Sequence, residues 1–255
     1  MNQADARTAA LTLRDEHARG VRFHPFAVPD IAAAYAVQEE YVRLLRTARR
    51  AGVAGYKVGL TSARMQAMCR IDSPIAGVVL DDGVQASGAR LARANYGRLG
   101  LEFEIAVRMG RDLGRNDGGA EVAEAIEAVA PAIEVVDDRG CDYATLDVLS
   151  LVADNSWNAG IVLGDFRPLG PDLSAVEGVV SLDGVETDRG FGRDVLGHPF
   201  ASVAWLAGRL AASGGGLKRG DVVMTGSIVT TKFPDRPCSY IFALDGLGAV
   251  AVTVE

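Results

Sequence analysis

Cysteines and long apolar runs are both scarce in this sequence of 255 residues. The three cysteines, Cys69, Cys141 and Cys238, lie far apart and have neither the spacing of a zinc site nor the density of a disulfide framework. We therefore expect a reducing, cytoplasmic location. No apolar run is long enough to cross a bilayer, and the residues after Met1 do not resemble a signal peptide. These observations predict a protein without a membrane partner.

Lysine and net positive charge are scarce as well. The formal net charge of −7 argues against nucleic acid as the main partner. Only three of the 26 basic residues are lysines, namely Lys57, Lys218 and Lys232. Because lysine can lose its proton when it is buried, whereas arginine cannot, each of these lysines is a candidate for proton transfer.

Common catalytic signatures are also missing. The sequence contains no Gly-x-Ser-x-Gly, P-loop or dinucleotide-binding motif. His17, His24 and His198 are far apart in the sequence, and the last two each precede a proline, which indicates structural loops. None of these chemistries is therefore indicated.

The sequence does contain many short apolar strands, with helices before and between them. Residues 4–19 and 31–50 predict two helices, and Asp30 is a candidate N-cap of the second. We expect residues 1–52 to form an N-terminal helical layer, continuous with a β-rich catalytic domain formed by residues 53–255. Further helices are expected at residues 63–69, 120–129, 143–153 and 200–212. Since regular βαβ alternation is absent, the order predicts an α+β fold.

The segment Leu101–Val107 predicts a strand with two different faces. Its odd-numbered residues are apolar, whereas Glu102 and Glu104 lie on the opposite face, about 6–7 Å apart along the strand. Two carboxylates directed at one point repel each other unless a cation lies between them. The alternative interpretation is a sheet with one solvated face, on which the two glutamates have no special role.

Glu134 favours the cation. It lies between Ile133 and Val135 in an apolar strand, and a buried carboxylate requires an ion pair or a metal ion. Three carboxylates would leave coordination positions for water and substrate, as Mg²⁺ and Mn²⁺ sites typically do. The alternative is an ion pair between Glu134 and an arginine such as Arg98 or Arg139.

Three other segments carry polar groups within apolar surroundings. Lys57 lies in an apolar strand flanked by glycines, so it is either a lysine whose ammonium reaches solvent or a desolvated amine of lowered pKa, suited to proton transfer. The segment 152–158 is either a turn or a loop that contacts substrate. In Thr225-Gly226-Ser227, hydroxyl and N–H groups are placed to hold a carboxylate.

Taken in order, these segments resemble the 2-keto-4-pentenoate hydratase and 4-oxalocrotonate decarboxylase family, within the fumarylacetoacetate hydrolase superfamily. The resemblance covers almost the whole chain, and the combination of motifs is more specific than any one of them. It rests on Gly55-Tyr56-Lys57-Val58-Gly59-Leu60-Thr61-Ser62, Leu101-Glu102-Phe103-Glu104-Ile105-Ala106, Ala132-Ile133-Glu134-Val135-Val136-Asp137-Asp138-Arg139, Ala153-Asp154-Asn155, Ala204-Trp205-Leu206-Ala207 and Thr225-Gly226-Ser227.

The resemblance implies a fold, a cofactor and a set of site residues. The fold would be a mixed β-roll or β-sandwich like that of fumarylacetoacetate hydrolase, with the helical layer added at the N-terminus. A Mg²⁺ or Mn²⁺ ion would be held by three glutamates, and Lys57 would be the catalytic acid and base. The resemblance also implies a homo-oligomer, or an assembly with a paralogous partner. The implied metal ligands are Glu102, Glu104 and Glu134, and the implied substrate-binding residues are Leu60, Asn155 and Ser227.

One position departs from the family. An aspartate that assists proton transfer commonly follows the proline about eighteen residues after the lysine, but here Ile75 follows Pro74. Asp72, Asp81 and Asp82 are close in sequence, and none of them can be assigned as the replacement from sequence. The departure leaves the reaction and the substrate less defined than the metal site.

We expect a metal-dependent lyase that hydrates a short unsaturated 2-hydroxy or 2-oxo acid, such as 2-hydroxypenta-2,4-dienoate, in the bacterial degradation of aromatic compounds by meta-cleavage. The product would be a 4-hydroxy-2-oxo acid. Decarboxylation of a vinylogous 2-oxo acid is the alternative, because it needs the same stabilisation of negative charge. A weakly catalytic partner subunit is the alternative from another class. Hydrolysis of a carbon–carbon bond is disfavoured, since no Glu–His pair is evident to activate water.

Overall fold

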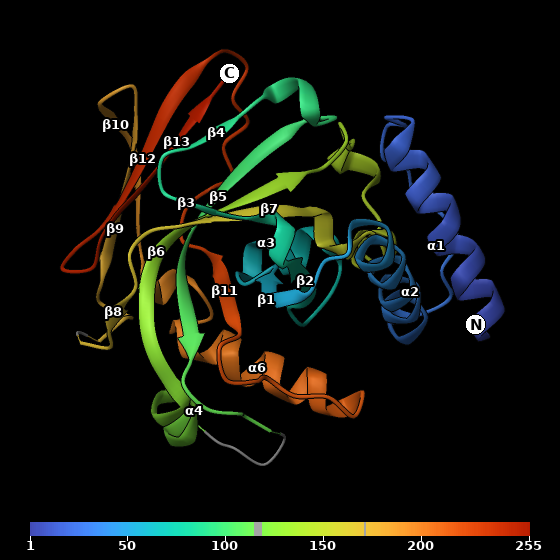
Figure 1. The fold of residues 1–255 in the computed structure, drawn as a ribbon, viewed down its shortest axis with the longest axis horizontal. Coiled ribbons are helices and arrows are strands. Elements are labelled where there is room, and N and C mark those ends of the chain that lie inside the picture. Colours follow the sequence, from blue (N-terminus) through green and yellow to red (C-terminus); the bar gives the residue numbers. More distant parts are fainter. Residues whose placement is uncertain (115–118, 171) are drawn as a thin grey trace.

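The computed structural model describes residues 1–114, 119–170 and 172–255 (Figure 1). An N-terminal helical layer lies at one end of the molecule and the smaller of two mixed sheets at the other, with the larger sheet between them. The helices are α1 (Gln3–Ala18), α2 (Ile31–Arg49), α3 (Ala63–Cys69), α4 (Gly119–Ala125), α5 (Val148–Ala153) and α6 (Pro199–Ala212). Both the helical and the strand content agree with the predicted α+β class.

The larger sheet has eight strands in the order β2-β1-β11-β5-β6-β7-β3, with β8 paired to β6. The smaller sheet has five strands in the order β10-β9-β12-β13-β4. The strands of the larger sheet are β1 (Val53–Gly59), β2 (Ile75–Leu80), β3 (Val84–Ala86), β5 (Leu99–Met109), β6 (Ile126–Asp137), β7 (Asn158–Leu163), β8 (Arg167–Pro168) and β11 (Val222–Ser227). Those of the smaller sheet are β4 (Ala89–Leu91), β9 (Glu177–Leu182), β10 (Val185–Phe191), β12 (Cys238–Leu244) and β13 (Gly248–Val254).

The predicted strand at residues 101–107 is the middle of β5, and its alternation is as expected. Leu101, Phe103 and Ile105 are fully buried in the main hydrophobic core. The opposite face of the strand is also covered, because Ala106 packs in a second apolar cluster with residues such as Met224 of β11. The interpretation as a strand with one solvated face is therefore wrong, and the glutamates of β5 lie inside the molecule.

The helix predicted at residues 120–129 is wrong over its second half. α4 ends at Ala125, and β6 begins at the next residue. Alanine-rich sequence favours a helix locally, but Ala128 and Val129 pair with β5 and are buried there. Pairing along the whole length of β5 outweighs this local preference, and it makes β6 long enough to reach the site.

The N-terminal helices pack directly on elements of the catalytic region. Asp30 caps α2 as predicted, because its carboxylate accepts a hydrogen bond from the N–H of Ala33. Gln38 of α2 donates hydrogen bonds to the carbonyl oxygens of Ala76 in β2, at 2.9 Å, and of Val152 in α5, at 2.7 Å. The layer therefore supports the strand and the helix that border the site. Within the described residues, no helix combines the length and the apolar character needed to cross a bilayer.

Candidate active site

Three glutamates from two adjacent strands converge at one point of the larger sheet. Glu102 and Glu104 lie on β5, and Glu134 lies on β6 directly opposite Glu102 in the antiparallel register. One carboxylate oxygen from each of the three residues lies within 4.8 Å of the other two. Glu104 and Glu134 are completely buried, and Glu102 is half-buried. The register between β5 and β6 thus brings together the residues that were predicted as metal ligands.

Each of these carboxylates is held by a protein donor through one of its oxygens. Thr231 Oγ1 donates to Oε1 of Glu102 at 2.8 Å, and Asn158 Nδ2 donates to Oε1 of Glu134 at 2.9 Å. The backbone N–H of Gly226 donates to Oε2 of Glu104 at 2.7 Å. These three donors fix the orientation of the carboxylates, which stay close enough for one oxygen of each to lie within 4.8 Å of the others.

Two of the remaining oxygens lack a hydrogen bond within the part of the chain that is described. They are Oε1 of Glu104 and Oε2 of Glu134, and both are buried. Buried polar atoms are rarely left without a partner unless an ion or a ligand supplies one. A hard cation with oxygen ligands fits this donor set, because three carboxylates leave coordination positions free for water and substrate. The geometry is therefore that of a divalent-cation site.

The charges of the cluster also fit a cation. Burial and the charges of the other two glutamates raise the pKa of Glu104 well above its usual range. Burial raises the pKa of Glu134 to about 7, although the ammonium of Lys57 acts in the opposite direction. Both shifts express the cost of holding carboxylates together in a buried site. A divalent cation among them removes the cause of the repulsion.

Lys57 reaches the same cluster from β1. Its side chain is buried, and Nζ lies 3.4 Å from Oε2 of Glu134. Burial alone lowers the pKa of Lys57, but the three glutamates outweigh burial and raise it. The lowered pKa that was predicted for Lys57 is thus absent while the glutamates carry their full negative charge. A cation among the glutamates would cancel much of that charge and shift the balance toward the neutral amine.

A cavity of about 540 Å³ opens at this cluster. Lys57 and Glu102 line it, together with Leu60 and Ser227, two of the residues predicted to bind substrate. Ser227 donates its hydroxyl proton to the carbonyl of Val229 and accepts a hydrogen bond from the N–H of Phe103. Its position is therefore fixed at the cavity wall.

The side chain of Asn155 lies elsewhere than predicted. Its amide donates to the carbonyl of Val78 and accepts from the N–H of the same residue, at 2.9 and 2.8 Å. Asn155 is not among the residues that line the cavity of the carboxylate cluster, and both ends of its amide bind the backbone of Val78 in β2. The following residues, Ser156 and Trp157, line the cavity instead.

Asn155, Ser156 and Trp157 form an unusual stretch of backbone, because all three have positive φ values, from 49° to 60°. Residues other than glycine rarely adopt this conformation, so neighbouring contacts must hold it. Asp154, which precedes the stretch, and Asn158, which follows it, have such contacts. Asn158 binds Glu134, as described above.

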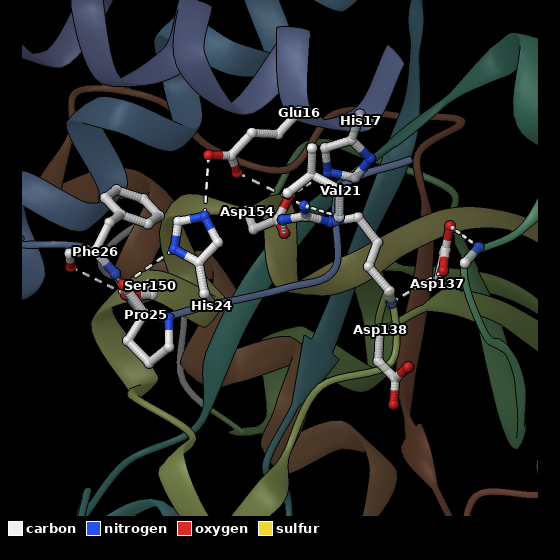
Figure 2. A network of polar contacts seen from close by, with 12 residues as sticks. Glu16, His17, Val21, His24, Pro25, Phe26, Asp137, Asp138, Ser150 and Asp154 are labelled. Carbon is white, nitrogen blue, oxygen red and sulfur yellow. Dashed lines mark hydrogen bonds and ion pairs between the residues drawn. The ribbon is translucent and has the colours of Figure 1, made fainter. Parts of the chain in front are cut away.

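A buried network of charged residues holds Asp154 (Figure 2). Arg139 Nη2 donates to Oδ2 of Asp154 at 2.6 Å, and Nε2 of His17 lies 2.6 Å from Oδ1. Glu16 lies 3.7 Å from Arg139 and 3.1 Å from the imidazole of His24, so α1 takes part through two consecutive residues. The N-terminal layer thereby fixes one end of the backbone stretch that carries Asn158. Sequence reasoning identified the segment 152–158 but missed the role of His17 and Asn158.

The alternative partners proposed for Glu134 are engaged with other residues. Arg139 pairs with Asp154, and Arg98 pairs with Asp138. The only lysine or arginine paired with Glu134 among the described residues is Lys57. The interpretation of Glu134 as the partner of a structural arginine is therefore wrong.

Ile75, at the position where the resemblance to the family leads us to expect an aspartate, lies near the lysine. It is buried, and it lines the cavity with Lys57. Asp81 accepts a hydrogen bond from the N–H of Gly52, and Asp82 lies 3.8 Å from Arg49. Neither of these aspartates lines the cavity, and Asp72 does not line it either. The neighbouring aspartates therefore do not replace the missing carboxylate, and the wall next to Lys57 is apolar.

Comparison with known proteins places these features in a family. The family described as fumarylacetoacetate (FAA) hydrolase C-terminal matches residues 53–255, which include all three glutamates and Lys57. The chain belongs to the fumarylacetoacetate hydrolase family. The match begins at the first residue of β1, and so α1 and α2 precede the matched region.

Several named hydratases are similar to this chain. A 2-keto-4-pentenoate hydratase of Burkholderia vietnamiensis is 34% identical over 255 residues, covering 98% of this chain and 92% of the relative. A 2-oxo-hept-4-ene-1,7-dioate hydratase of Escherichia coli is 36% identical over 215 residues, covering 81% of this chain and 79% of the relative.

Two solved structures with bound metal ions also resemble it. The 4-oxalocrotonate decarboxylase of Pseudomonas putida G7, complexed with magnesium and adipate, superposes with a TM-score of 0.93 at 28% identity and covers 100% of this chain and 99% of its own. The fumarylpyruvate hydrolase of Pseudomonas aeruginosa, with Mn²⁺ and pyruvate, has a TM-score of 0.63 at 18% identity and covers 78% of this chain and 88% of its own. The second likeness concerns the fold alone.

Proposed function

We propose that this protein is a divalent-metal-dependent hydro-lyase, which adds water to a short unsaturated 2-hydroxy or 2-oxo acid such as 2-hydroxypenta-2,4-dienoate. The product is a 4-hydroxy-2-oxo acid, formed in the bacterial degradation of aromatic compounds by meta-cleavage. The observation that carries the proposal is the convergence of Glu102, Glu104, Glu134 and Lys57 at one cavity. Identity of 34% with a 2-keto-4-pentenoate hydratase over 98% of the chain supports it.

The three glutamates hold Mg²⁺ or Mn²⁺ in this proposal. Their free oxygens are hard ligands, and both ions prefer such ligands. When bound, the cation supplies positive charge beside the oxygens of the substrate's 2-oxo acid group, where negative charge develops during the reaction. Asn158, Thr231 and the N–H of Gly226 keep the glutamates in place throughout.

Lys57 holds and transfers the proton. Hydration of a conjugated 2-hydroxydienoate requires a proton to reach the remote carbon before water adds to its neighbour, and Lys57 is the lysine that lines the cavity. Its buried Nζ next to Glu134 is placed to give up a proton when the charge of the glutamates is neutralised. Ser227 and Leu60 position the acid at the cavity wall.

Decarboxylation of a vinylogous 2-oxo acid is the second candidate function. The close superposition on a 4-oxalocrotonate decarboxylase, with a TM-score of 0.93 over the whole chain, favours it. The apolar wall formed by Ile75 beside Lys57 also favours it, because loss of carbon dioxide needs no group that activates water. A third possibility is a weakly catalytic partner subunit of a paralogous enzyme.

The proposal extends to the assembly and its surroundings. We propose a catalytic unit of residues 53–255 with residues 1–52 as a supporting layer. We further propose a homo-oligomer in the cytoplasm, where the three free cysteines suit a reducing environment.

Incubation of the Mn²⁺-loaded protein with 2-hydroxypenta-2,4-dienoate and, separately, with 4-oxalocrotonate tests the proposal. Products are identified by mass spectrometry and by release of carbon dioxide. Hydrated product without carbon dioxide supports the hydratase, whereas release of carbon dioxide from 4-oxalocrotonate supports the decarboxylase. Metal binding without turnover of either compound contradicts both and supports the partner subunit.

A further inference from the structure

Almost every charged side chain that lines the cavity of the carboxylate cluster already has a partner. Arg189 donates to Glu186 at 2.8 and 2.9 Å, and Asp188 pairs with Lys232. Arg64 lines the same cavity and is exposed, and the structure gives it no hydrogen bond, ion pair or ring contact with any described residue. It is therefore a guanidinium available to a ligand.

Arg64 is connected to the catalytic lysine by one continuous wall of the cavity. The wall begins at Lys57 in β1 and passes through Leu60 at the turn. It then continues along α3 to the last residue of this helix, Cys69. Arg64 lies on α3 beyond this turn, whereas the glutamates lie on β5 and β6, so the cavity is bordered by the two groups from different elements.

Apolar side chains form part of the cavity lining next to this wall. Met65, Met68, Leu146 and Leu151 line the cavity together with Val136. These side chains suit the hydrocarbon chain of a ligand. A carboxylate at one end of that chain would meet the cation and Lys57, and a carboxylate at the other end would meet the guanidinium of Arg64. The volume of about 540 Å³ leaves room for a chain longer than a five-carbon acid.

We propose that Arg64 binds a second carboxylate at the far end of the substrate, so that the substrate is an unsaturated 2-oxo dioic acid rather than a monoacid. This inference rests on the proposed function, because it takes the glutamate cluster as the site of the 2-oxo acid group. An extended diacid with seven carbons spans about 7 Å between its terminal carbons at ~1.2 Å per bond, and a cavity of about 540 Å³ can hold it. Arginine suits this role because its planar guanidinium can bind a carboxylate through two hydrogen bonds.

Binding of two unreactive acids tests the proposal without relying on turnover. 2-Oxoadipate and 2-oxohexanoate have the same number of carbons, and only the first has a distal carboxylate. Titration calorimetry with the Mn²⁺-loaded protein should give at least tenfold tighter binding for 2-oxoadipate. Arg64→Gln should remove this preference and leave the affinity for 2-oxohexanoate within twofold of the wild-type value.

Arg70→Gln is the matched control, because Arg70 follows the same short helix, is exposed and does not line the cavity. It should retain the full preference, and circular dichroism should show that both variants are folded. Equal affinity of the wild type for the two acids overturns the proposed role of Arg64, but not the proposed function. The same holds if Arg64→Gln lowers the affinity for both acids equally. Failure of the loaded protein to bind either acid overturns the proposed function as well.

The wild type and Arg64→Gln should also differ in their kcat/KM values for diacid and monoacid substrates. With unsaturated substrates, Arg64→Gln should lower kcat/KM for a 2-oxo dioic acid at least tenfold, mainly through KM, because the residue contacts the end of the substrate that does not react. The value for 2-hydroxypenta-2,4-dienoate should stay within twofold. A wild-type preference for the monoacid contradicts the inference while leaving the hydratase function intact.

Discussion

The amide of Asn158 donates a hydrogen bond of 2.9 Å to Oε1 of Glu134, and this contact leaves only Oε2 to face the other glutamates and Lys57. Asn158 is the first residue of β7, directly after the three residues with positive φ. The strained segment and the proposed metal ligand Glu134 are therefore joined by a single hydrogen bond.

Asn158→Ala should weaken binding of Mn²⁺ to the protein by about 10–100-fold, the usual effect of removing a residue that orients a metal ligand. Glu134 would lose its donor and could turn away from the cluster. Electron paramagnetic resonance of free Mn²⁺ during a titration measures the change. Asn95→Ala, at an exposed position that does not line the cavity, should leave the affinity unchanged; an equal loss in both variants would count against the role of Asn158.

Lys57→Met should act on metal binding in the opposite direction. Removal of the ammonium 3.4 Å from Glu134 takes away a positive charge that repels the incoming cation, so Mn²⁺ should bind more tightly. Turnover should fall by about 10²–10⁴-fold, because the proton-transfer group is lost. Parallel measurements of metal affinity and kcat distinguish these two effects.

Lys57→Arg is the informative companion variant. It keeps the positive charge but cannot give up its proton, so metal affinity should stay close to the wild-type value while activity is lost. If Lys57→Arg retained activity, proton transfer through this residue would be excluded.

Asp154→Asn should destabilise the protein by about 3–5 kcal/mol, because it removes the nearer of the two carboxylates paired with the buried guanidinium of Arg139. Asp82→Asn is the matched control, since Asp82 forms an exposed pair with Arg49 at 3.8 Å, and such pairs contribute about 0–1 kcal/mol. Urea unfolding of both variants gives the two values. A loss of less than 1 kcal/mol for Asp154→Asn would mean that the network does not hold this segment.

Gly226→Ala should lower both stability and metal affinity. Gly226 has a φ of +116°, its N–H binds Glu104, and an added Cβ would overlap the side chain of Thr61. Gly220→Ala separates strain from overlap, because Gly220 has a φ of +91° with no atom within 4 Å of an added Cβ. Both variants should lose about 1–3 kcal/mol from backbone strain, and Gly226→Ala about 1–3 kcal/mol more from overlap.

Metal affinity distinguishes the two glycine variants further. Only Gly226→Ala disturbs the donor to Glu104, so only this variant should bind Mn²⁺ more weakly. Thermal unfolding and the Mn²⁺ titration supply both measurements. The same loss of affinity in Gly220→Ala would show that general destabilisation, rather than the contact with Glu104, is responsible.

Local periodicity predicted the part of the site that lies within single strands. The alternation in residues 101–107 correctly assigned the apolar face, and the apolar neighbours of Glu134 correctly predicted its burial. The sequence could not establish that Glu134 lies opposite Glu102, because this depends on the register between β5 and β6. The pattern suggested a three-carboxylate site as one of two interpretations of Glu134, and the resemblance to the hydratase family then favoured that site.

The residues that sequence reasoning missed act through contacts between distant segments. Thr231 lies 129 residues from Glu102, and His17 lies 137 residues from Asp154. Residues 126–129 were predicted as helical because their local composition favours a helix, whereas pairing with β5 determines their structure. Asn155 was expected in the cavity, but the backbone groups of Val78 engage its amide. Each difference arises from tertiary contacts that composition and spacing do not encode.

Binding of Mn²⁺ to Glu104→Gln is the most direct test of the divalent-cation site. The substitution preserves the shape of the side chain and removes its charge, and Glu127→Gln, at an exposed position of β6, serves as the control. We predict one Mn²⁺ per wild-type and Glu127→Gln chain, and at least 100-fold weaker binding to Glu104→Gln. Wild-type binding of Mn²⁺ that persists unchanged in Glu104→Gln would contradict a site built from Glu102, Glu104 and Glu134.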